Sequence, residues 1–126
     1  MISIEEFSEL LDEIAEELPV EFFKELNGGI ILKKKAKLHP KSEGDDLYVM
    51  GEYSVSRQMG KQIFIYYGSF EKIYSDAGKG RIKNKLRKTV LHEFQHHLEK
   101  MAGEKQLEIE DQQQLIKYQK KKNERE

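Results

Sequence analysis

The longest periodic segment of the sequence, residues 81–101, constrains the fold most. Its apolar residues recur every three or four positions, which is the spacing of one face of an α-helix. They are Ile82, Leu86, Val90, Phe94, Leu98 and Met101. The segment therefore predicts a long amphipathic helix that packs against a core, and Gly103 is expected to end it.

Three further helical segments are predicted. Ser3 and Glu6 match a capping box at the start of an amphipathic helix that Pro19 interrupts. A short second helix is expected over residues 20–26, because an Asn-Gly-Gly stop signal follows it. Residues 107–117 show helical spacing again and predict a last helix.

Three segments have the character of strands. Residues 30–38 alternate between apolar and lysine-bearing positions, which favours a half-buried edge strand. Lysines on an edge strand prevent aggregation with other sheets, and this interpretation is favoured over a phosphate-binding patch. Residues 47–55 place their apolar side chains on one face, whereas residues 62–67 are apolar on both faces, as in a central strand. The connections favour antiparallel neighbours. The fold class predicted is α+β, with a small, mostly antiparallel or mixed sheet packed against helices.

The 126 residues favour a single domain over residues 1–119, followed by a charged tail, residues 120–126, that is expected to fray. Because 22 basic residues face 23 acidic ones, the net charge of −1 argues against a nucleic-acid partner. The Lys33–Lys37 segment and the basic tail do not outweigh that balance. No apolar run and no leader pattern indicates a membrane, so a cytoplasmic protein is expected. The oligomeric state stays open.

The predicted long helix contains His92-Glu93-Phe94-Gln95-His96, a His-Glu-x-x-His motif. At about 100° and 1.5 Å per residue, the two histidines lie one turn apart on one face, where two imidazoles can bind one ion. Glu93 is turned by about 100° from His92, which suits a general base beside a metal-bound water. His97 projects toward the apolar stripe and is predicted to be a core histidine paired with a buried acceptor.

A catalytic zinc ion takes three protein ligands and a water molecule. The chain has no cysteine and His39 lies in a loop that we expect to be remote, so the third ligand is expected to be a carboxylate. Asp111 is the first choice and Glu108 the second, because both fall on the inward face predicted for the last helix. Zinc is the favoured ion, although such a ligand set also suits iron or manganese.

The segment TVLHEFQHHLE, together with the upstream LYVMGEY and EELPVEFFKELNGGI, resembles the small bacterial zincin-like metallopeptidases, or minimal zincins. The resemblance covers the chain up to about Leu115. It implies an α+β domain with the motif on a long active-site helix, zinc on His92 and His96, catalytic Glu93 and a carboxylate third ligand. Many members continue His-His-Phe-Gly-x-x-Asp, whereas Glu99 and Ala102 stand at the Gly and Asp positions here.

The function expected from these observations is a zinc-dependent metallopeptidase. Metal-activated water would attack a peptide bond of a peptide or protein substrate, with Glu93 as the general base. In zincins a peptide adds beside an edge strand near the metal helix, although the sequence does not say which strand. The alternative is a non-catalytic zincin-like domain that binds metal or regulates a protein partner.

Overall fold

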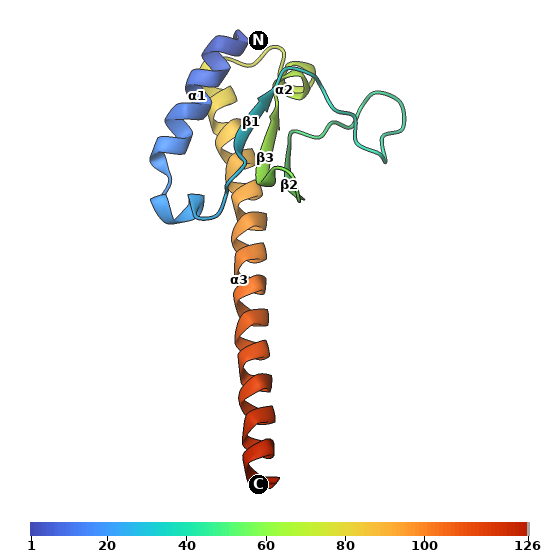
Figure 1. Cartoon of the computed structure of the whole chain (residues 1–126). Helices are drawn as coiled ribbons and strands as arrows, with labels where there is room; N and C mark the ends of the chain where they lie inside the picture. Colours follow the sequence, from blue (N-terminus) through green and yellow to red (C-terminus); the bar gives the residue numbers. More distant parts are fainter. Residues whose placement is uncertain (126) are drawn as a thin grey trace.

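The computed structural model describes residues 1–125 and has the predicted α+β class (Figure 1). Its elements, in chain order, are α1 (Ile4–Glu17), the 3-10 helix η1 (Val20–Phe23), β1 (Gly29–Lys33), β2 (Gly51–Ser56), β3 (Gly60–Tyr66), α2 (Tyr67–Ile73) and α3 (Lys79–Arg125). No helix among the described residues is long and apolar enough to cross a membrane.

The sheet has three strands in the order β1-β3-β2. The prediction that β3 is the central strand is confirmed, and Ile63 and Ile65 on one of its faces are buried. The hairpin of β2 and β3 is antiparallel, as expected. The expectation of antiparallel neighbours is wrong for β1, which pairs with β3 in parallel, because the chain crosses to the far edge through β2 before it returns to the centre.

Both outer strands are shorter than predicted. β1 ends at Lys33 instead of residue 38, and β2 begins at Gly51 instead of residue 47. The chain between them is a loop whose two ends meet at a single antiparallel bridge between Leu38 and Tyr48. The apolar alternation continues into these flanks, but they pair with each other at this bridge instead of extending β1 and β2.

The core lies between the sheet and the helices α1 and α3. α1 contributes Phe7, Leu10, Leu11 and Ile14, and α3 contributes Ile82, Leu86, Val90 and Phe94. The predicted capping box is present, since the Ser3 hydroxyl accepts a hydrogen bond from the backbone N–H of Glu6. The short second helix is confined to η1, because Glu25 adopts a left-handed conformation with φ of 61°.

α3 is the element that departs most from the prediction. It begins at Lys79 and runs without a break to Arg125, so Gly103 does not end it and residues 107–117 form no separate helix. The segment from residue 120 that was expected to fray continues this helix to Arg125, and residue 126 lies outside the described part of the chain. The second half of α3 extends well past every other element (Figure 1).

Candidate metal centre and substrate cleft

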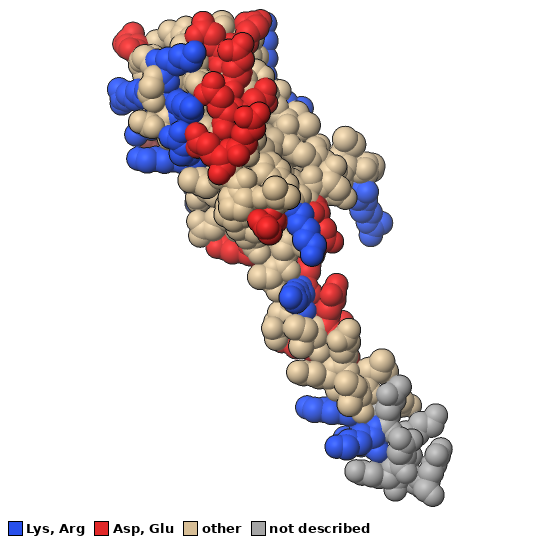
Figure 2. Space-filling view, turned by 90° about the vertical axis from the view of Figure 1, so that its left-hand side faces the viewer, with Lys and Arg blue, Asp and Glu red and all other residues tan. Residues whose placement is uncertain are grey.

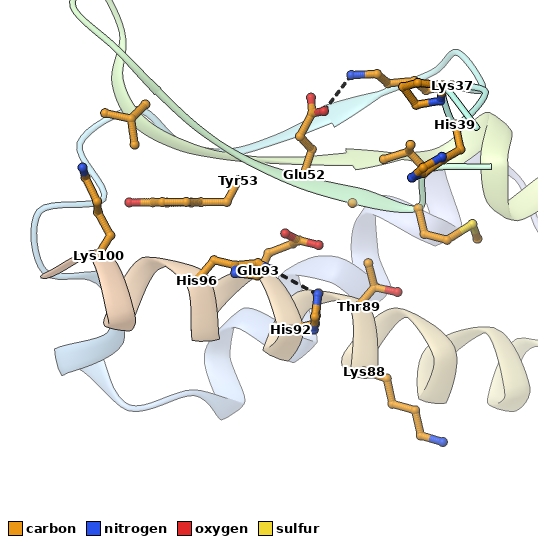
Figure 3. Close-up of a pocket in the computed structure, with 15 residues that line it drawn as sticks. Lys37, His39, Glu52, Tyr53, Lys88, Thr89, His92, Glu93, His96 and Lys100 are labelled. Carbon is orange, nitrogen blue, oxygen red and sulfur yellow. Dashed lines mark hydrogen bonds and ion pairs between the residues drawn. The ribbon is translucent and has the colours of Figure 1, made fainter. Parts of the chain in front are cut away.

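The two motif histidines face each other on the turn of α3 that passes β2 (Figure 3). The Nε2 atoms of His92 and His96 are 3.1 Å apart, and the two rings are nearly perpendicular. Two nitrogen ligands of a tetrahedral zinc ion, each at about 2.0–2.1 Å from it, lie about 3.3 Å apart. The pair therefore fits two corners of a zinc site before any metal binds.

Glu93 is almost completely buried, with 6% of its surface exposed. It fits under β2 because Gly51 has no side chain: a Cβ atom at Gly51 would come within 3.2 Å of the Glu93 carboxylate. Burial raises the pKa of the Glu93 carboxyl above its ordinary value, and the neighbouring histidines offset part of that rise. A carboxylate with a raised pKa is a better proton acceptor, as a general base requires.

These side chains open into a cleft of about 960 Å³ between α3, β2 and the loop that joins β1 to β2. The expectation that His39 is remote is wrong, because this loop brings it to the wall of the same cleft (Figure 3). Its Nδ1 atom accepts a hydrogen bond of 3.0 Å from the backbone N–H of Lys41. Sequence spacing offered no signal for this placement, since it depends on how the loop folds back.

His97 is a fully buried core histidine, as predicted. Its Nε2 atom donates a hydrogen bond of 2.8 Å to the backbone carbonyl of Lys24, and its Nδ1 atom accepts one of 2.8 Å from the hydroxyl of Tyr53. The side chain thus joins α3, the segment after η1 and β2 at one point. It also fixes Tyr53, which lines the cleft, beside the motif helix.

The structure does not bring either carboxylate predicted as the third ligand to the histidine pair. Because α3 is continuous, Glu108 and Asp111 lie about 18 Å and 22 Å along the helix axis from His96, and both are exposed. Glu52 is close to the cleft, but its carboxylate is held by Lys37 at 2.7 Å on the far side of β2 (Figure 3). Among the side chains that the structure describes, no three from His, Asp and Glu are grouped closely enough to hold an ion.

A small mixed sheet beside a helix that carries His-Glu-x-x-His defines a compact domain of the zincin class. The model of the zincin-like metallopeptidase family matches residues 43–115, which is more than half of the chain. The chain therefore belongs to this family.

One similar solved structure is a conserved hypothetical protein from Thermus thermophilus, with 35% sequence identity and a TM-score of 0.66. The match covers 81% of this chain and 99% of that one. A search of curated proteins found no match.

Proposed function

We propose that this protein is a metallopeptidase that binds zinc through His92 and His96 and uses Glu93 as its general base. The observation that carries the proposal is the 3.1 Å approach of the two Nε2 atoms beside a buried carboxylate in an open cleft. A bound zinc ion would supply Lewis acidity toward water and a substrate carbonyl. Glu93 would accept the proton of the attacking water and return it to the leaving amine.

The proposed substrate is an extended peptide that pairs with β2. This strand is at an edge of the sheet, so the backbone groups along its outer side have no neighbouring strand. Five of its residues or near neighbours line the cleft, namely Met50, Gly51, Glu52, Tyr53 and Val55. Main-chain pairing with an edge strand gives affinity for many sequences, and the side-chain pockets select among them.

The metal part of the proposal is tested by zinc titration against a chromophoric chelator. The His92→Ala and His96→Ala variants should each lose at least ten-fold in zinc affinity, because each removes one of two ligands. His39→Ala is the matched control, since it removes a cleft histidine outside the pair and should leave the affinity within about two-fold. Equal zinc binding by all three variants would reject the site.

The catalytic part is tested separately by digestion of a peptide library. Glu93→Gln preserves the size of the side chain and removes the base, so it should bind zinc like the parent protein and cleave no peptide. Cleavage by purified Glu93→Gln protein at the parent rate would exclude the assigned role.

The second candidate function is a zinc-binding domain without turnover. One observation favours it: the described residues provide two protein ligands where a catalytic zinc site has three. Such a site should bind zinc more weakly than a three-ligand centre. Zinc bound at the histidine pair, with no cleavage of any library peptide, would support this candidate over the peptidase.

A further inference from the structure

The part of α3 beyond Ala102, which we call the stem, is joined to the domain at its base by the ion pair of Glu104 with Lys61 of β3, and past Glu104 the described helix has no other element against it (Figure 1). Its apolar side chains are in water: Ile109 is 39% exposed, Leu115 57% and Ile116 61%. In proteins most of the stability of a helix comes from packing its apolar face against another element rather than from the helix itself. The stem therefore lacks the packing that would hold it as a helix in a monomer.

The face of α3 that carries Ile109 and Ile116 is also uncovered where the helix passes the rest of the domain. Leu91 and Leu98 are 41% and 37% exposed, and with Phe22, Phe94 and Ala102 they line an apolar groove at the base of the stem. At about 100° per residue, Leu91, Leu98, Ile109 and Ile116 fall within about 20° of one another around the helix. The groove and the stem therefore form one continuous apolar stripe along α3.

We propose that this stripe is a dimer interface, in which the stem of one copy lies antiparallel in the groove of a second copy. Leu91 and Leu98 are seven residues apart, as are Ile109 and Ile116. The midpoint along the sequence between Leu98 and Ile109 falls between residues 103 and 104, and so does the midpoint between Leu91 and Ile116. A two-fold axis at that point therefore places each isoleucine of one copy opposite a leucine of the other, in the self-complementary manner of a closed dimer.

Charge favours the antiparallel arrangement over a parallel one. The first 23 residues carry eight acidic side chains and no Lys or Arg, and Figure 2 shows acidic side chains gathered on the face where α1 lies. The far part of the stem is basic, with Lys117, Lys120 and Lys121. An antiparallel pair brings this basic end level with residues 86–90 of the second copy, beside its α1. α1 has seven acidic side chains, of which Glu13 and Glu17 are already paired with Lys83 and Arg87 of α3, so the helix keeps an excess of acidic groups there, whereas a parallel pair would place the two basic ends together.

The oligomeric state is measured by sedimentation equilibrium of the full chain at micromolar concentrations. The parent protein should have twice the mass of the 14.9 kDa chain. Ile109→Glu/Ile116→Glu should be monomeric. The matched control is Leu107→Glu/Tyr118→Glu, which changes two side chains on the opposite face of the stem and should stay dimeric. A monomeric parent protein, or a control that dissociates as readily as the interface variant, would overturn the proposal.

The orientation is tested by disulfide trapping, which is direct because the natural chain contains no cysteine. In an antiparallel dimer, a mixture of Leu98→Cys and Ile109→Cys proteins should form a mixed disulfide under mild oxidation. Ile109→Cys alone should remain reduced. Self-linking of Ile109→Cys without the mixed product indicates a parallel dimer and refutes the arrangement proposed here. Neither experiment depends on zinc or on peptide cleavage.

Discussion

Replacement of His97 with phenylalanine should destabilise the protein through two lost hydrogen bonds. Phenylalanine fills the same fully buried position without a polar atom, so the Lys24 carbonyl and the Tyr53 hydroxyl lose the partners that they hold at 2.8 Å. An orphaned buried polar group costs about 1–3 kcal/mol. The Tyr53 hydroxyl is only partly buried and can reach water, so the two losses together should cost about 2–4 kcal/mol.

The assay is thermal unfolding of the metal-free protein followed by circular dichroism. For a domain of this size 1 kcal/mol corresponds to about 4 °C, so the Tm of His97→Phe should fall by about 8–16 °C. Tyr53→Phe leaves the Nδ1 atom of the fully buried His97 without a partner and should cost about 1–3 kcal/mol. The double variant His97→Phe/Tyr53→Phe has no Tyr53 hydroxyl that could be orphaned. The double variant should therefore be destabilised by less than the sum of the two single costs. A His97→Phe Tm within about 2 °C of the parent value, or strictly additive costs, would refute this reasoning.

Three further predictions concern the cleft and α3. The hydrogen bond and ion pair with Lys37 lower the pKa of Glu52, so this group stabilises the fold above about pH 4.5 and the gain is lost as the pH falls through the lowered pKa. In urea melts, Glu52→Gln should cost under about 1 kcal/mol at pH 7, and the difference from the parent protein should shrink steadily as the pH is lowered below about 4.5. Gly51→Ala places a methyl group 2.8 Å from the Thr89 side chain and 3.2 Å from Glu93 and should cost about 1–3 kcal/mol in thermal melts, whereas Gly80→Ala, at a helical position with open space around it, should not destabilise the protein. Gly103→Ala should raise helical ellipticity and stabilise α3 by up to about 1 kcal/mol, since the helix runs through this glycine with nothing against it; an unchanged spectrum and Tm would show that the stem is not helical in solution.

Features set by local spacing could be predicted from the sequence. The capping box at Ser3, the apolar face of α3, the central position of β3 and the buried role of His97 all follow from residues a few positions apart. The approach of His92 and His96 belongs to the same group, because one helical turn fixes it. Such features depend on the geometry of a single element and need no knowledge of what packs beside it.

Features set by distant segments could not be predicted. The parallel pairing of β1 with β3 depends on which edge of the sheet remains free once the β2–β3 hairpin has formed. The placement of His39 in the cleft depends on a long loop folding back over α3. α2 was missed because residues 67–73 follow a strongly apolar strand and begin with no capping side chain.

The distance of the later carboxylates from His96 and the length of the stem both follow from the continuity of α3 through residues 99 and 102. In the pattern that this chain resembles, a glycine stands two residues after the adjacent histidines, and glycine is the residue that most often follows the end of a helix. Glu99 and Ala102 occupy the Gly and Asp positions of that pattern here, and both are good helix formers, so α3 continues and carries every later carboxylate away from His96. The same continuation extends the apolar face that begins at Leu91 and Leu98. The continuous helix therefore has two consequences at once: it carries Glu108 and Asp111 away from the histidine pair, and it exposes the apolar stripe that the proposed dimer would bury.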